Sequence, residues 1–305
     1  MEGKKPSRGS LGWVGEIVTA FLLLHGLGNA QIPLVAVRQN TQERLLVDKS
    51  DTLPFTLIDG YLIVVEGRIG AHRHLRLVLD TGSTHSVLRS DFPGVQTSVR
   101  RPVRIINLEK VVKQELAEVQ DFELGPLCIS RLPIMLHDLN YLRKPLPGLD
   151  GVIGLDVLRT RSFSIDFRRR RIAFGASPTL RNSANMENKD VYLAVGVGIL
   201  NRPVRLVLDT GIRAILLYRD RMGSRLPALR VEEHIQGASL SGAASLQLVD
   251  LPRMQLSGTY LNPRAVLLQH SPAGLLPQLD GYLSLKALGA QRFNFDFEKS
   301  IFSWE

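Results

Sequence analysis

The chain has 305 residues, of which 44% are hydrophobic and 22% are charged. This is the composition of an ordinary globular protein with a sizeable core, long enough for two domains or one large one. The single cysteine, Cys128, excludes an intrachain disulfide, and its apolar neighbours predict a buried, inert thiol rather than a catalytic one. The formal net charge of +9 raises polyanions as partners, but no nucleic-acid motif or aromatic-interleaved basic face accompanies it. We therefore expect no nucleic-acid partner.

The first thirty residues are typical of a secretory signal peptide. A basic start is followed by an apolar run over residues 17–27, and small residues lead up to position 30. We expect cleavage after Ala30 and export to the periplasm or the medium, which leaves no stable membrane span. The alternative is a membrane anchor retained at the N-terminus, although the run is short for a span. Residues 31–53 are polar and mixed, and are predicted to form an N-terminal arm or a first strand.

Short strands dominate the rest of the chain. Aliphatic and β-branched residues bounded by turn formers predict strands at 61–65, 75–79, 191–197 and 204–208. Helical patterns are short, chiefly at 155–159 and 285–288. The protein is therefore predicted to be mainly β.

A duplication divides the chain into two halves. The heptapeptide Arg-Leu-Val-Leu-Asp-Thr-Gly occurs at residues 76–82 and again at 205–211, so that Asp80 and Asp209 are 129 positions apart. Two further blocks repeat at an offset of 130: residues 150–155 match 280–285, and residues 163–167 match 293–297. Three blocks in one register indicate two copies of one structural unit. We expect lobes over residues 54–175 and 191–305, joined by a polar linker over residues 176–190.

Each heptapeptide is a short apolar strand that ends in Asp-Thr-Gly, so the two halves present one carboxylate each, Asp80 and Asp209. Two carboxylates held about 3 Å apart cannot both ionise easily and share a proton over a wide pH range. One is then a base and the other an acid at the same moment. A water between them can attack a carbonyl carbon while the acid protonates the carbonyl oxygen, with no metal or cofactor required. The pair titrates as a unit.

With these motifs the chain resembles the aspartic proteases of the pepsin-like and retroviral-type superfamily. In that family each lobe or subunit contributes one Asp-Thr-Gly loop, and a hydrophobic-hydrophobic-Gly segment crosses behind it, as residues 152–154 would do here. The resemblance covers residues 54–305 and implies a bilobal acid-protease fold with two pseudo-twofold related, β-barrel-like lobes. The short units are more similar to fused copies of the compact retroviral-type fold than to long pepsin lobes.

The resemblance also implies roles for the matching positions. Asp80 and Asp209 would be the catalytic dyad. Thr81 and Thr210 would brace the two loops against each other across the lobe interface. Gly82 and Gly211 would present backbone amides to the carboxylates, and the Ser83 hydroxyl would donate to the outer oxygen of Asp80. A flap hairpin should cover the substrate, and the stretches 105–114 and 236–245 are its candidates.

Two positions in the second half depart from the family pattern. Ile212 stands where a Ser, Thr or Ala is usual, so Asp209 lacks the hydroxyl expected beside Asp80. Ser284 replaces the glycine that ends the second crossing segment, which would strain or reshape it. The two substitutions either make the dyad asymmetric or mark a lobe that is drifting from catalysis.

Simpler structural explanations exist for several residues. The two Asp-Thr-Gly units could be capped turns of a duplicated β protein, although that does not explain their identical strands. The remaining candidates are expected to be structural: turn or cap residues at Asp150 and Asp280, hairpin turns at Asp166 and Asp296, a solvated turn at residues 168–171, and loop histidines without a metal at His72, His74 and His85.

The sequence leaves two functions open. The first is an exported, monomeric aspartic endopeptidase that grips an extended peptide and hydrolyses one amide bond. The second is a catalytically silent module that keeps the fold for peptide or protein binding. Aliphatic strands beneath the cleft predict apolar side chains on either side of the scissile bond, and the basic surface favours acidic substrates.

Overall fold

The computed structural model describes residues 23–24, 51–93, 95–106, 111–188, 191–199, 202–223, 229, 231–239, 242–251, 253–275 and 278–305. The predicted signal peptide and arm therefore lie outside the described residues, apart from residues 23–24 and 51–53. The chain is mainly β, as predicted, and its helices are short. Within the described ranges, no helix has the length and apolar character needed to cross a membrane.

The first half is built largely of antiparallel strands. Its elements are β2 (Thr52–Ile58), β3 (Leu62–Ile69), β4 (His72–Leu79), β5 (Val87–Arg89), β6 (Gln96–Ile106), β7 (Val111–Leu124), β8 (Leu127–His137), α1 (Asn140–Arg143), β9 (Leu149–Ile153) and α2 (Leu155–Leu158). The short strand β1 (Leu23–Leu24) pairs antiparallel with the end of β6. Alternation along β8 places Cys128 on its exposed face between two buried residues, so the prediction of a buried thiol is wrong.

The second half repeats this plan. Its elements are β13 (Ala194–Ile199), β14 (Arg202–Asp209), β15 (Ile215–Tyr218), α3 (Arg219–Met222), β16 (Val231–Ser239), β17 (Gly242–Asp250), β18 (Met254–Leu256), β19 (Thr259–Leu261), β20 (Arg264–Leu268), β21 (Gly281–Ser284) and the 3₁₀ turn η2 (Lys286–Leu288). The predicted strands and short helical segments of both halves are confirmed, with boundaries shifted by a few residues.

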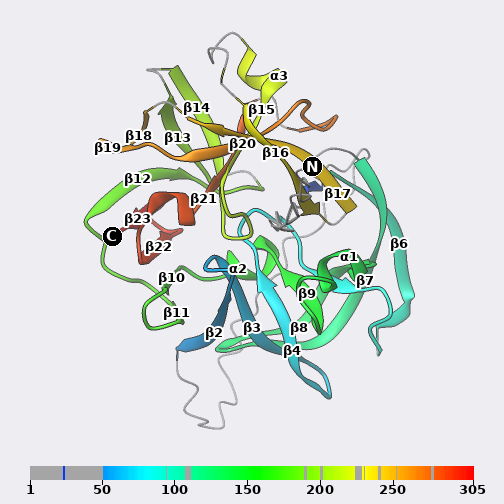
Figure 1. Ribbon diagram of the computed structural model, residues 1–305. Helices are drawn as coiled ribbons and strands as arrows, with labels where there is room; N and C mark the ends of the chain where they lie inside the picture. Colours follow the sequence, from blue (N-terminus) through cyan, green and yellow to red (C-terminus); the bar gives the residue numbers. More distant parts are fainter. Residues whose placement is uncertain are drawn as a thin grey trace, which may run out of the picture.

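A third sheet joins the halves. It runs in the order β2, β11 (Arg171–Phe174), β10 (Phe163–Asp166), β22 (Arg292–Asp296), β23 (Ile301–Trp304) and β12 (Asn182–Glu187). Figure 1 shows the first half low and the second half high in the view, with β10, β11, β22 and β23 between them at the left. The predicted linker thus contains a strand, β12. Its side chains are mostly exposed or half-buried, and it pairs with β23 and, at its end, with β13, so no alternating pattern reveals it.

The central pair of this sheet consists of the two repeated blocks. Phe163 lies opposite Phe295, and Ile165 lies opposite Phe293. In the repeat, Phe293 is the counterpart of Phe163, and Phe295 is the counterpart of Ile165. Exchanging the two copies therefore leaves the pairing unchanged. The rings of Phe163 and Phe295 stack with centroids 4.7 Å apart, which packs the junction tightly.

Each half has a strand that crosses behind its Asp-Thr-Gly loop. β9 is parallel to β4 and antiparallel to β5, and β21 has the same relation to β14 and β15. The approach requires glycine, since a Cβ at Gly151 would lie 2.4 Å from the Val87 carbonyl oxygen and one at Gly281 would lie 2.0 Å from that of Leu216. The duplicated Asp-Gly pair therefore marks the site where the crossing strand slots between its neighbours.

Two long hairpins, β6–β7 and β16–β17, occupy the stretches considered for a flap. Their connecting residues, 107–110 and 240–241, lie outside the described residues. β6 and β7 extend at the right of Figure 1 from the first half toward β17 of the second. Near the end of β6, Ile105 packs in an apolar cluster of the first half and Ile106 in one of the second half. The end of β6 thus contacts both halves.

Candidate functional site

The two predicted aspartates occupy equivalent positions at the ends of β4 and β14. The Asp80 amide donates a hydrogen bond to the Ile153 carbonyl at the end of β9 (2.9 Å), and Asp209 pairs with Ser284 at the end of β21. Both carboxyl groups are buried. The crossing strands therefore fix both aspartates from behind, as the repeated blocks predict.

The threonines of the two loops form a crossed set of hydrogen bonds between the halves. The Thr81 amide donates to the Thr210 hydroxyl oxygen (3.0 Å), and the Thr210 amide donates to the Thr81 hydroxyl oxygen (3.1 Å). Each hydroxyl then donates to a carbonyl of the other half, Thr81 to Leu208 (2.9 Å) and Thr210 to Leu79 (2.8 Å). These four bonds lock the two loops together at one point.

The Asp80 carboxyl reaches the second loop across this junction. A Cβ at Gly211 would lie only 3.1 Å from the Asp80 Cγ, so the Asp80 carboxyl rests on the glycine two residues after Asp209. Asp80 Oδ1 accepts the amides of Gly82 (2.9 Å) and Ser83 (3.2 Å), and Asp209 Oδ1 accepts the amide of Gly211 (2.7 Å). The glycine amides thus contact the carboxylates as predicted. Asp209 Oδ2 is buried and has no hydrogen-bond partner among the described residues.

Burial governs the ionisation of this pair. It raises the pKa of Asp80 well above its ordinary value, against the opposing effect of the two backbone amides. Burial also raises the pKa of Asp209, and the negative charge of Asp80 raises it further. The two groups therefore titrate together, and one proton is retained on the pair at a pH where ordinary aspartates are charged.

The Ser83 hydroxyl does not serve Asp80. It donates to the His85 carbonyl oxygen at 2.8 Å, while the backbone amide of Ser83 is the group that reaches the carboxylate. The predicted hydroxyl contact is wrong because the turn directs this side chain toward the next residues of its own loop. Asp80 therefore has no hydroxyl contact from Ser83. Ile212, the counterpart of Ser83, does not deprive Asp209 of a contact that Asp80 has.

Ser284 replaces one contact with another. At Gly154 in the first half a Cβ would lie 2.6 Å from the His85 carbonyl carbon, so the loop packs directly on the glycine. There the Leu155 amide donates to the Ser83 carbonyl (2.8 Å). In the second half the Ser284 hydroxyl donates to the equivalent carbonyl, that of Ile212 (2.7 Å). The second crossing therefore stays bonded to its loop through a side chain.

Two features of the site were missed by the sequence reasoning. The first is Asp156, which accepts both the amide and the hydroxyl of Ser86 (2.9 and 2.7 Å), while the Gly154 amide donates to the Ser86 hydroxyl oxygen (3.1 Å). Burial raises the pKa of Asp156 to about 6. The Gly-Leu-Asp sequence directly after the first crossing strand was its available signal.

The second missed feature is Tyr282, which stands in β21 where the first half has Val152. Its ring packs edge-on against Tyr218, with centroids 6.3 Å apart. Burial raises the pKa of Tyr282 well above its ordinary value, and the charges of Tyr218, Asp209 and Asp80 add to this. The second half therefore has a phenol group in its crossing strand where the first half has an aliphatic side chain.

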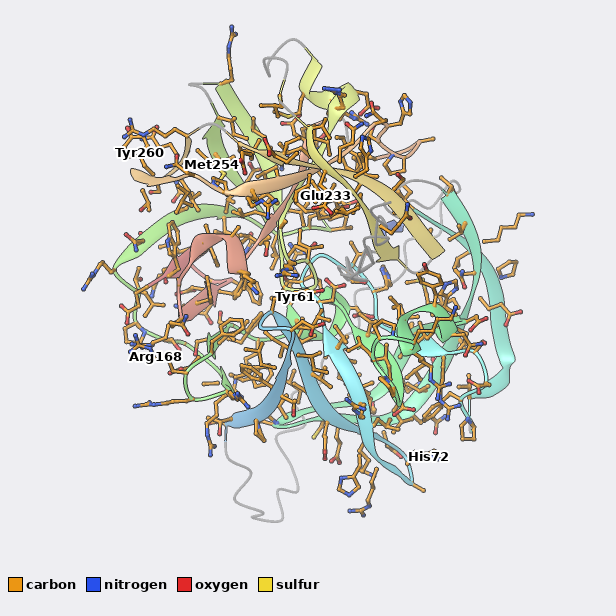
Figure 2. The ribbon with its side chains drawn as sticks, viewed as in Figure 1. Tyr61, His72, Arg168, Glu233, Met254 and Tyr260 are labelled. Atoms are coloured by element: carbon orange, nitrogen blue, oxygen red, sulfur yellow. The ribbon has the colours of Figure 1, made fainter. Side chains whose placement is uncertain are left out.

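The remaining candidates lie outside the site. Asp150 and Asp280 accept the amides of Arg76 and Arg205 at 3.0 Å each, which ties each crossing strand to its heptapeptide strand. The predicted turns at Asp166 and Asp296 are confirmed, since each accepts an amide three residues on at 2.9 Å. Residues 167–170 form the exposed turn between β10 and β11, and Figure 2 shows Arg168 at the lower left, far from the centre.

The three histidines are dispersed. His72 lies at the outer end of the β3–β4 hairpin (Figure 2), where it packs edge-on against Phe92. His74 contacts Glu66, and His85 Nδ1 lies 3.0 Å from the Thr84 hydroxyl. Burial lowers the pKa of His85 to about 4. Within the described part of the chain, no three or more acidic, histidine or cysteine side chains gather as a metal site.

A scan against models of protein families finds none that matches this chain. A search of curated proteins likewise finds no significant relative. The assignment of a function therefore depends on the residues and geometry described above.

Proposed function

We propose that the protein is an aspartic endopeptidase with a bilobal acid-protease fold, in which two pseudo-twofold related lobes supply one catalytic aspartate each. The observation that carries this proposal is the crossed bonding of Thr81 and Thr210 beneath two buried carboxyl groups. A capped turn needs a single loop. It gives no reason for two loops from distant parts of the chain to brace each other symmetrically and bury two carboxyl groups.

The shared proton provides the chemistry. The charged carboxylate takes a proton from a water molecule as the water oxygen attacks the carbonyl carbon of the peptide. The protonated carboxyl gives its proton to the carbonyl oxygen, so no free oxyanion builds up. The carbon–nitrogen bond then breaks, and the leaving amine receives a proton from the pair. Raised pKa values at both aspartates keep the singly protonated form available toward neutral pH.

The two hairpins support an extended peptide as the substrate. β6–β7 and β16–β17 come from opposite halves, and β6 contacts apolar clusters of both. Hairpins in these positions can close over a bound peptide and exclude water from the carboxyl pair. A monomer suffices, because one chain supplies both aspartates.

The decisive experiment compares the wild type with Asp80→Asn and Asp209→Asn on a denatured protein substrate between pH 3 and 7. Each substitution removes one partner of the acid–base pair, and we expect cleavage to fall by about 10³-fold or more. Asp250→Asn, at an exposed site on β17, is the matched control and should retain full activity. Pepstatin should inhibit the wild type.

The contrary results are equally clear. Cleavage that survives in both aspartate variants would come from another site or a contaminant. A wild type that cleaves nothing at any pH, yet binds denatured protein, would instead identify a silent binding module.

We also propose that the protein is exported. The N-terminal sequence of the protein recovered from the medium or periplasm should begin at Gln31 if the signal peptide is cleaved. Recovery in the membrane fraction with Met1 or Glu2 at the N-terminus would establish the retained anchor instead.

A further inference from the structure

A partly open cavity of ≈ 300 Å³ lies where the two halves meet. The first half contributes Tyr61 and Phe167 to its wall, and the second half contributes Ile212, Lys286 and Phe293. The volume is at the lower end of the range for ligand pockets, and large enough for one side chain of a peptide. Most of its wall is apolar.

The cavity lies beside the second Asp-Thr-Gly loop. It is lined by Thr210 and Ile212, which stand on either side of Gly211. Tyr61 belongs to the apolar cluster that includes Ile105 of β6, and Ile212 belongs to the cluster that includes Ile106. Figure 2 shows Tyr61 at the centre of the molecule, between the halves. A peptide that runs from the carboxyl pair past the second loop would reach this cavity.

Lys286 is the charged side chain of the cavity wall. Its Nζ lies 3.3 Å from the Asp59 carbonyl oxygen and 5.8 Å from the centroid of the Tyr61 ring. Lys286 is exposed, and no carboxylate pairs with it among the described residues. None of the described residues that line the cavity is acidic. An ammonium group without a carboxylate partner, at the edge of an apolar cavity, matches a ligand group with an apolar stem and an acidic end.

The first half offers no equivalent cation. The repeat counterpart of Lys286 is Asp156, whose carboxylate is turned inward to Ser86. The charge therefore stands on one side of the carboxyl pair only. Neither Asp80 nor Asp209 lines the cavity, so the peptide residue that enters it is not one of the two flanking the scissile bond.

We propose that this cavity is a specificity site for an acidic residue of the substrate, with a glutamate stem on its apolar wall and the carboxylate paired with Lys286. This inference rests on the proposed peptidase function. It defines the substrate class as extended peptides that carry a glutamate at one fixed distance, on one side, from the bond that is cleaved.

The test uses a cleavable peptide in which one residue at a time is Glu, Gln or Lys. At a single position we expect the wild type to show a KM for the Glu peptide about threefold lower than for the Gln peptide, with kcat unchanged, as for a partly exposed ion pair. Lys286→Met should abolish this difference. Lys286→Glu should reverse it and favour the Lys peptide, a shift on the order of tenfold.

The matched control is Lys144→Met, which removes an exposed lysine that also lies over a tyrosine ring, at 5.5 Å from Tyr141. It should leave the charge preference intact. Equal KM values for the three peptides at every position would overturn the proposal. So would a Lys286→Met variant that loses kcat equally on all peptides and melts earlier, because Lys286 would then be a structural brace to Asp59.

A binding experiment separates this inference from the peptidase assignment. Asp80→Asn protein is titrated with fluorescent Glu, Gln and Lys peptides, and the Kd values are compared with and without Lys286→Met. A charge preference that depends on Lys286, found together with a wild type that never cleaves, would refute the peptidase and keep the specificity site. Cleavage by the wild type with no charge preference would support the peptidase and refute the specificity site.

Discussion

The two Asp-Thr-Gly loops share a sequence and a backbone arrangement, but they are supported differently. Around Asp80 the support is polar, since Ser83, Ser86 and Asp156 bind loop and crossing strand together. Around Asp209 the corresponding positions are Ile212, Ile215 and Lys286, and a single hydroxyl, that of Ser284, takes over the bond to the loop. The comparison teaches that the carboxyl geometry is set by backbone and threonine contacts, while the shell behind them is free to differ.

The largest expected effect tests what the loops have in common. Thr81→Val and Thr210→Val each leave a buried amide and a buried carbonyl of the other half without a partner. We expect each to lower the free energy of unfolding by about 4 kcal/mol, at roughly 2 kcal/mol for each orphaned group. Urea denaturation measures this, and Thr56→Val on the exposed face of β2 is the control. Strongly unequal losses of unfolding free energy in the two variants would show that the two threonines do not contribute equally.

The next effect separates the two crossings. Gly154→Ser places a side chain against the His85 backbone and should cost about 3 kcal/mol, although the same residue is native at the counterpart, Ser284. Thermal melting compares this variant with Ser284→Gly, which should lose less. If Gly154→Ser were tolerated, the first loop would be as adaptable as the second.

A pH-dependent effect sharpens the contrast between Asp156 and its counterpart Lys286. The pKa of Asp156 is about 6 in the folded chain, against an ordinary value of 3.8, so the folded state holds the proton more tightly. Its contribution to stability is present below pH 4 and is lost as the pH rises through 6. The loss amounts to at most about 3 kcal/mol. Asp156→Asn should remove this part of the pH dependence, measured by urea denaturation from pH 4 to 7.

Asp138→Asn, at an exposed position before α1, serves as the control for that series. An unchanged pH profile in Asp156→Asn would show that the carboxylate is well solvated in the folded chain. In that case the polar support of the first loop would not be sensitive to pH.

The smallest effect concerns the single hydroxyl behind Asp209. Ser284→Ala removes the bond to the Ile212 carbonyl and should cost about 1 kcal/mol, with a smaller loss of activity than Asp209→Asn. Circular dichroism melts and peptide cleavage measure the two quantities. A loss of activity as complete as that of the aspartate variant would mean that Ser284 takes part in positioning the carboxylate itself.

The sequence predicted the parts of the site that depend on repetition and strand pattern. The heptapeptide fixed attention on Asp80 and Asp209, and the structure brings them to one junction with Thr81 and Thr210 bonded as expected. The sequence prediction failed for the Ser83 hydroxyl, because the direction of this group depends on a turn that offers it the His85 carbonyl oxygen instead of the Asp80 carboxylate. The sequence also failed to predict the strand β12, in which one buried residue, Met186, gives no alternating pattern.

By itself, the sequence determined that the chain is a duplicated β protein and that each copy ends a strand in Asp-Thr-Gly, since hydrophobic alternation and residue identity are local properties. Only the tertiary structure decided that the Asp80 carboxyl rests on Gly211, that Tyr282 packs against Tyr218, and that Lys286 lines a cavity between the halves. Contacts across more than a hundred residues depend on how the two halves close on each other, and no local pattern encodes that closure.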